Sequence, residues 1–116
     1  MYTVKGILVF KNMNKMTFIY GLVIEGPKQG IYLLDEFCME WCNRALKWWD
    51  SSFYWAQQYF EPLVRKGKIN TIYIDVDKNN DFITPDEYKT CRVFRRKKGW
   101  EQLKKLNILE KIQMPK

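Results

Sequence analysis

The chain has 116 residues, 47% of them hydrophobic and 28% charged, and its 20 Lys and Arg against 13 Asp and Glu give a formal net charge of +7. This composition indicates one globular domain over residues 1–116 and excludes an intrinsically disordered chain. The sequence contains no His, which excludes a Ser-His-Asp triad, a Cys-His pair and a His-ligated zinc site. No apolar run reaches the roughly 18 residues that a membrane span needs, so we expect no membrane partner.

The cysteines and the overall composition suggest where the protein works. Cys38, Cys42 and Cys91 are an odd number and form no disulfide framework. This pattern fits a reducing compartment, so we expect a cytoplasmic, intracellular protein whose cysteines are buried as small hydrophobic residues. The low Ala content and the many Lys, Asn, Ile and Tyr residues are typical of an AT-rich source, and a short chain without catalytic His suits a viral or mobile-element protein.

The first half of the chain is expected to form a β-hairpin followed by two helices. Residues 2–10 and 16–25 are rich in β-branched and aromatic types, and a polar stretch joins them. Both faces of the second strand are apolar, which is typical of a strand covered on both sides or lying centrally in a sheet. Apolar residues then recur at three- and four-residue steps over 34–49 and 53–63, which predicts two amphipathic helices.

The second half is expected to form one further strand and a basic helical region. Polar and apolar residues alternate over 71–77, which predicts a strand with one apolar face. Residues 84–87 combine an N-cap residue, a proline and an acid in the capping-box pattern, which predicts a helix from about Pro85. Gly99 should end it, and leucines at three-residue steps after Trp100 predict a last helix. The expected fold class is therefore α+β.

Positive charge is concentrated in the last quarter of the chain. Residues 88–116 contain ten Lys and Arg against two Glu, a net charge of +8, whereas residues 1–87 sum to −1. Closely spaced cations release the counterions of a polyanion, so we expect this segment to bind nucleic-acid phosphates or, alternatively, an acidic protein surface. Aromatic residues beside the cations can stack on unpaired bases. The candidate nucleic-acid-binding residues are Arg92, Arg95, Arg96, Lys97, Lys98, Trp100, Lys104 and Lys105.

An acidic loop precedes the basic segment. From Asp75 to Asp86, side chains with oxygen atoms recur at alternate positions, as a hard cation requires on one short loop. This string resembles the twelve-residue calcium loop of the EF-hand family, with Asn80 at the place of the family's Gly, and a second register ends at Glu87. The resemblance implies Ca²⁺ ligands at Asp75, Asp77, Asn79, Asp81, Asp86 and Glu87. The alternative is that these residues only form a turn and cap the next helix.

The same acidic residues suggest a third possibility. Asp75 or Asp77 at a strand end, followed by Glu87 and Lys89, resembles the Asp…Glu-x-Lys arrangement of the restriction-endonuclease-like nucleases. This resemblance implies that two carboxylates hold Mg²⁺ and that the lysine lies near the attacking water. Glu40 can supply an extra carboxylate. Such sites place Glu and Lys on one strand, whereas the capping pattern predicts a helix start at Glu87.

We therefore expect a small non-enzymatic binding protein whose basic C-terminal segment contacts nucleic-acid phosphates. One alternative is a protein-interaction module organised by a divalent cation at the acidic loop 75–87, and the second is the Mg-dependent nuclease. The expected cofactors are none or Ca²⁺. The surplus of aromatic residues also allows a homo-oligomer.

Overall fold

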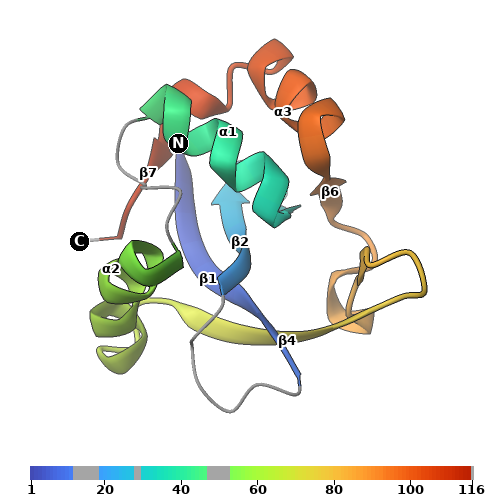
Figure 1. The fold of residues 1–116 in the computed structure, drawn as a ribbon. Helices are drawn as coiled ribbons and strands as arrows, with labels where there is room; N and C mark the ends of the chain where they lie inside the picture. The colour runs from blue at the N-terminus through green and yellow to red at the C-terminus, as the bar shows by residue number, and fades with distance from the viewer. Residues whose placement is uncertain (12–18, 28–29, 47–52, 116) are drawn as a thin grey trace.

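The computed structural model describes residues 1–11, 19–27, 30–46 and 53–115, and within them the chain forms a seven-stranded mixed sheet and three α-helices (Figure 1). The strands are β1 (Tyr2–Phe10), β2 (Ile19–Gly26), β3 (Gly30–Leu34), β4 (Asn70–Val76), β5 (Phe82–Ile83), β6 (Arg92–Phe94) and β7 (Ile112–Gln113). The α-helices are α1 (Glu36–Leu46), α2 (Phe53–Arg65) and α3 (Arg96–Lys105), and the 3-10 helices are η1 (Asp86–Tyr88) and η2 (Leu109–Lys111). The predicted α+β fold class is confirmed.

The sheet has the strand order β5-β4-β1-β2-β3-β6, and β7 pairs with β1 off this path. β1 and β2 pair antiparallel from Thr3–Glu25 to Val9–Ile19, which confirms the predicted hairpin, although its connection at 12–18 lies outside the described residues. β2 is antiparallel to β3, β4 is parallel to β1, and β6 is parallel to β3. The carboxyl ends of β1, β3, β4 and β6 therefore lie at one edge of the sheet.

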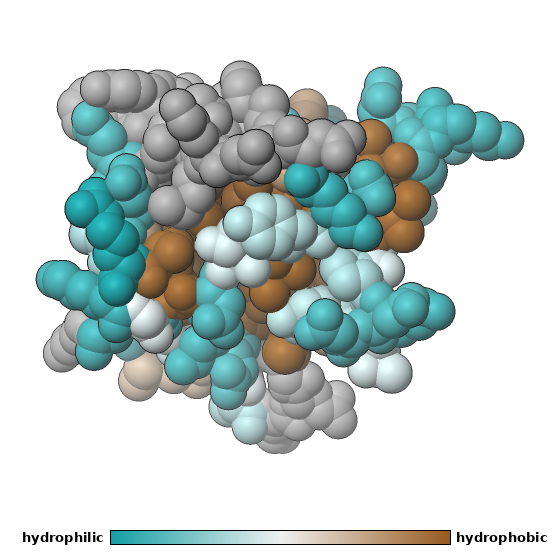
Figure 2. All heavy atoms as spheres, turned by 90° about the horizontal axis from the view of Figure 1, so that it is seen from below, coloured by the Kyte–Doolittle hydropathy of each residue, from teal (hydrophilic) through white to brown (hydrophobic). Residues whose placement is uncertain are grey.

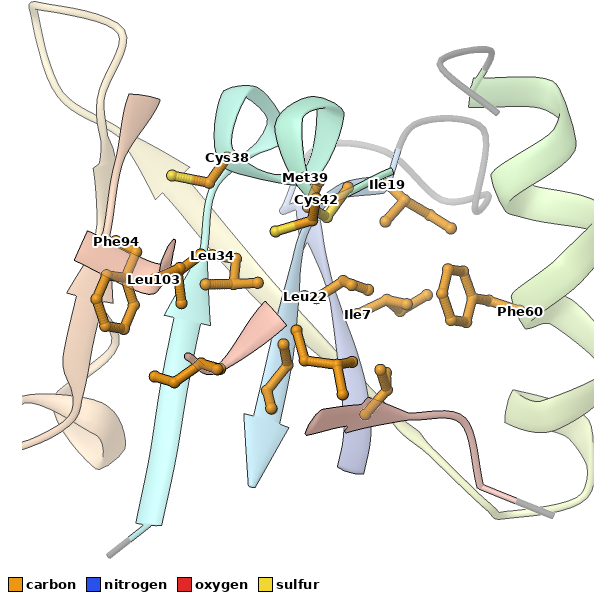
Figure 3. Close-up of a cluster of buried hydrophobic side chains, with 14 of the residues drawn as sticks. Ile7, Ile19, Leu22, Leu34, Cys38, Met39, Cys42, Phe60, Phe94 and Leu103 are labelled. Carbon is orange, nitrogen blue, oxygen red and sulfur yellow. The ribbon is translucent and has the colours of Figure 1, made fainter. Parts of the chain in front are cut away.

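The helices lie on one face of this sheet. Buried side chains of β1 and β2, including Ile7 and Leu22, belong to the same cluster as Cys38 and Met39 of α1, and as Phe60 of α2. Figure 3 shows Phe60 opposite Ile7, with the α1 side chains close to the strands. α1 also packs against α3, whereas α2 lies apart from α3 (Figure 1). None of the helices in the described ranges is long and apolar enough to cross a membrane.

The opposite face of the sheet carries a second, smaller cluster. Its buried members all come from strands: Leu8, Val23, Leu33, Ile74 and Phe82. Because neighbouring residues of β2 are buried on opposite faces, this strand is covered on both sides and lies centrally between β1 and β3. The prediction made from its two apolar faces is confirmed.

The predicted helix from about Pro85 is wrong. Residues 86–88 form only the 3-10 helix η1, and the chain then enters strand β6. Phe94 of β6 is buried, and the strand pairs with β3 from Tyr32–Arg92 to Leu34–Phe94. Burial and pairing in the sheet outweigh the local helix-start signal, because tertiary context overrides propensity.

Gly99 does not end a helix, because α3 runs through it from Arg96 to Lys105. The glycine is buried where α1 and α3 approach each other, and a Cβ at this position would lie 2.5 Å from the Cys38 Sγ atom. α3 ends instead before Asn107, whose φ of 57° is the left-handed conformation common after helices. The last helix predicted up to Ile112 is replaced beyond this point by η2 and β7.

Part of the surface is apolar. Figure 2 shows the molecule from below the view of Figure 1, with hydrophobic residues lying between hydrophilic ones. Exposed large hydrophobic side chains include Phe37, Tyr59, Tyr73 and Ile83. Exposed apolar patches occur at protein interfaces, so the homo-oligomer stays a prediction.

Candidate nucleic-acid interface

The position of α3 depends on Asp35, which directly follows β3 and is only 3% exposed. Its Oδ1 atom accepts hydrogen bonds from the backbone N–H of Cys38 at 2.9 Å and of Arg96 at 3.0 Å. The first bond caps α1, and the second holds Arg96 in a left-handed conformation with a φ of 59°. One carboxylate thus joins the starts of α1 and α3. The prediction missed Asp35, although an Asp before a helical pattern is an N-cap signal.

The outward side of α3 carries four exposed lysines, Lys97, Lys98, Lys104 and Lys105, which we call the basic face. With 3.6 residues per turn, these positions lie opposite the buried Gly99 and Leu103. Glu101 lies among them and leaves the face with a net charge of +3. Among the residues that the structure describes, none of the four lysines forms an ion pair. Four of the predicted binding residues are therefore gathered on one surface.

Two predicted binding residues form hydrogen bonds within the chain, Arg95 in a half-buried position and Arg96 at the surface. The Arg95 Nη2 atom donates to the Phe82 carbonyl oxygen at 2.7 Å, and its guanidinium carbon lies 4.4 Å from the Phe82 ring centroid. The Arg96 Nη2 atom donates to the Asp81 Oδ1 atom at 2.6 Å. Both arginines therefore fasten the start of α3 to the β4–β5 hairpin.

The remaining two predicted binding residues differ in exposure. Arg92 is exposed on β6, with its guanidinium 5.6 Å from the Phe94 ring centroid. Trp100 is half-buried, and its ring centroid lies 5.0 Å from the ring centroid of Trp41. The Lys104 ammonium lies 5.2 Å from the ring centroid of Trp100. Arg92 is thus accessible to a ligand, whereas Trp100 packs against Trp41 of α1.

Residues 77–81 of the acidic loop form the turn of the β4–β5 hairpin. The Asp77 Oδ1 atom accepts hydrogen bonds from the backbone N–H of Asn79 at 2.8 Å and of Asp81 at 3.1 Å. Asn80 has a φ of 62°, the left-handed conformation that Asn tolerates where a turn requires it. These contacts match the alternative in which the Asp and Asn residues close a turn.

The other predicted metal ligands form separate ion pairs or none. Asp75 lies 3.5 Å from the Lys11 ammonium, and Asp86 lies 3.0 Å from that of Lys89. Glu87 is exposed on η1. Over the described ranges, no group of three or more Cys, Asp or Glu residues is arranged to hold a metal ion. Calcium binding at this loop stays a prediction.

The nuclease arrangement requires Glu87 and Lys89 on one face of a strand. In the structure, Glu87 belongs to the 3-10 helix η1 and Lys89 follows that helix with its side chain paired to Asp86. Glu40 lies on α1. The geometry therefore gives the nuclease prediction no support.

A cavity of about 450 Å³ opens at the edge of the sheet where the parallel strands end. Its charged lining residues are Asp35, Glu36, Glu40 and Arg96, a net charge of −2, and its aromatic ones are Phe10, Tyr20 and Phe37. Burial, and then the charges of Asp35 and Glu40, raise the pKa of Glu36. Sequence analysis missed this site, because its residues come from separate elements. Its negative charge would repel a phosphate backbone and so favours the basic face as the contact surface.

Tyr20 lines the same cavity, and we expect its ionisation to destabilise the protein at alkaline pH. Burial, and then the charges of Asp35 and Asp81, raise its pKa from 10.0 to about 12. Above pH 10 the unfolded phenol loses its proton while the folded one keeps it, so stability falls as the pH rises toward 12. Tyr20→Phe should reduce this fall, as measured by urea unfolding at pH 9 to 12.

The control for this experiment is Tyr73→Phe, since Tyr73 is exposed. Phe at position 20 keeps the ring that packs against Phe10 and Phe82. The Tyr73 variant should retain the alkaline curve of the wild type. Equal curves for both variants would contradict the assignment to Tyr20.

Comparisons of this chain with protein-family models, with curated proteins and with solved structures found no match.

Proposed function

We propose that this protein is a non-enzymatic binding protein that contacts nucleic-acid phosphates through the basic face of α3. The observation that supports this function is the exposure of Lys97, Lys98, Lys104 and Lys105 on one side of one helix. The opposite side of α3 packs against α1 and β6, so the side that carries the lysines faces outward. Arg92, exposed on neighbouring β6, adds a fifth cation.

The expected interaction is electrostatic and independent of base sequence. Each phosphate that a lysine or arginine neutralises releases counterions, so affinity falls as salt is added. If all five cations engage phosphates, log K should fall against log salt with a slope between about −3.5 for a single strand and −4.5 for a duplex. Raising the salt from 50 to 200 mM should then weaken binding by about 100- to 500-fold. Fluorescence anisotropy with a labelled oligonucleotide measures both values.

A pair of double variants tests whether the position of the charge matters. Lys97→Gln/Lys105→Gln removes two cations from the basic face, and Lys66→Gln/Lys68→Gln removes two exposed cations after α2. The first variant should reduce the salt slope by about two units, and the second should leave it unchanged. Equal losses would mean that only net charge matters and would overturn the proposal. Absence of binding to any oligonucleotide at 50 mM salt would overturn it too, and would favour an acidic protein partner.

A further inference from the structure

A second cavity, of about 450 Å³, lies beside the first turn of α3 and is lined by Thr84, Val93, Arg95, Lys98, Gly99 and Gln102. Its polar side chains are a guanidinium, an ammonium, a hydroxyl and an amide, all of which can donate hydrogen bonds. Among the residues that the structure describes, no carboxylate lines it, in contrast to the acidic cavity at the sheet edge. A cavity with this lining is suited to an anion with several acceptor oxygens.

Arg95 is held rigidly at this cavity. The bond from its Nη2 atom to the Phe82 carbonyl oxygen and the stacking on the Phe82 ring fix the plane of the guanidinium. Its Nε atom is buried and has no hydrogen-bond partner among the described residues. Because Nε is shielded from solvent, an anion in this cavity would be bound by the remaining Nη donors of Arg95, and a guanidinium held in one orientation loses little conformational entropy on binding.

The backbone at the start of α3 adds further donors. The N–H of Arg96 is occupied by Asp35, and the N–H of Gly99 by the Arg95 carbonyl oxygen. In the described part of the chain, the N–H groups of Lys97 and Lys98 donate to no protein acceptor. Of these two residues only Lys98 lines the cavity, and the positive end of the helix dipole adds to the positive charge of its lining.

We infer that this cavity binds one phosphate group, held by Arg95 and Lys98 and oriented by Thr84 and Gln102. This inference rests on the proposed function and deepens it. One phosphate of the nucleic-acid strand would be held in the cavity by direct hydrogen bonds. The remaining lysines of the basic face would then contact neighbouring phosphates as exposed charges. Free inorganic phosphate carries the same acceptor oxygens as a phosphate group of a strand. The experiment must therefore distinguish binding of the free ion from binding of the strand.

Two single-lysine variants test the cavity. Lys98→Gln removes a lysine that lines it, and Lys105→Gln removes a lysine of the same face that does not. Each should reduce the salt slope by about one unit. Lys98→Gln should also weaken oligonucleotide binding about tenfold more than Lys105→Gln, because it removes a charge-assisted hydrogen bond. If the two variants bind the oligonucleotide equally but more weakly than the wild type, the cavity is not a phosphate site and the proposal for the basic face stands. If neither variant loses affinity, both the phosphate site and the basic-face proposal are overturned.

Thr84→Val provides a test that leaves the charge unchanged. It should weaken binding about threefold without altering the salt slope, because only a hydroxyl donor is lost. Unchanged affinity would exclude a role of Thr84 and count against the cavity. Melting temperatures of all three variants check that each is folded.

Inorganic phosphate distinguishes the two sources. If the cavity accepts free phosphate, this ion should displace the labelled oligonucleotide from the wild-type protein more strongly than chloride at equal ionic strength. The excess displacement should disappear in Lys98→Gln. If phosphate and chloride act alike while Lys98→Gln still loses tenfold, the cavity accepts phosphate only as part of a strand. If they act alike and the two lysine variants bind equally, the inference is overturned.

Discussion

Replacing Asp35 with Ala should lower the free energy of unfolding by about 2–4 kcal/mol, because two backbone N–H groups lose their acceptor. The Cys38 N–H is buried, and the Arg96 N–H lies in a left-handed turn that the carboxylate holds in place. An unpaired buried donor carries its full desolvation cost, which exceeds the loss of an exposed helix cap. Urea unfolding followed by tryptophan fluorescence measures the difference.

The adjacent Glu36 provides the matched control for this prediction. Glu36→Ala also removes a carboxylate from the first turn of α1, but no hydrogen bond to this side chain is found among the described residues. Its effect should stay within about 0.5 kcal/mol. Asp35→Asn keeps one acceptor oxygen and should fall between the two. Equal losses of unfolding free energy for Asp35→Ala and Glu36→Ala would contradict this prediction. Local charge, and not the two hydrogen bonds of Asp35, would then determine stability where α1 and α3 begin.

Gly99→Ala should destabilise the protein by about 1–3 kcal/mol through overpacking. In an ordinary helix interior, Gly→Ala is stabilising by roughly 0.5–1 kcal/mol. A destabilising Gly99→Ala would therefore indicate overpacking at this position. The added Cβ would lie 2.5 Å from the Cys38 Sγ atom and 2.7 Å from the Phe94 carbonyl carbon. Because backbone atoms cannot rotate away as a side chain can, α3 would have to move.

Thermal unfolding of Gly99→Ala beside Glu101→Ala tests this prediction. Glu101 is exposed on the same helix, so its replacement should change the melting temperature little. Adding Cys38→Ala to Gly99→Ala should restore part of the loss, while the contact with Phe94 remains. A melting temperature of Gly99→Ala at or above that of the wild type would show that α1 and α3 do not approach as closely as described.

The elements predicted correctly from sequence are those with an extended local pattern. β1, β2 and β4 carry runs of strand-forming residues, and α1 and α2 show a helical period, so each could be recognised without knowledge of its neighbours. β6 and β7 have three and two residues, which is too few for a period to be visible. Their structure depends on pairing with β3 and β1, and that partner cannot be identified from local sequence.

The candidate site was predicted in part for a related reason. The density of positive charge drew attention to Lys97, Lys98, Lys104 and Lys105, which the structure places on one side of α3, although the sequence pattern had divided them between two helices at Gly99. Their role in binding stays a prediction. The same density also included Arg95 and Arg96, whose partners Phe82 and Asp81 belong to a hairpin that precedes them in the chain. Charge counting cannot show that a distant carbonyl or carboxylate already accepts one hydrogen bond from each guanidinium and sets its orientation.

The pairing of β7 with β1 has a consequence for synthesis on the ribosome. Tyr2 and Thr3 of β1 are synthesised well before Ile112 and Gln113, with which they pair. In a nascent chain, the backbone hydrogen-bonding groups of Tyr2 and Thr3 that face β7 therefore stay unpaired until translation has passed Gln113. During that interval the unpaired edge is available to other extended chains, so chaperones that cover exposed strands would act at this point.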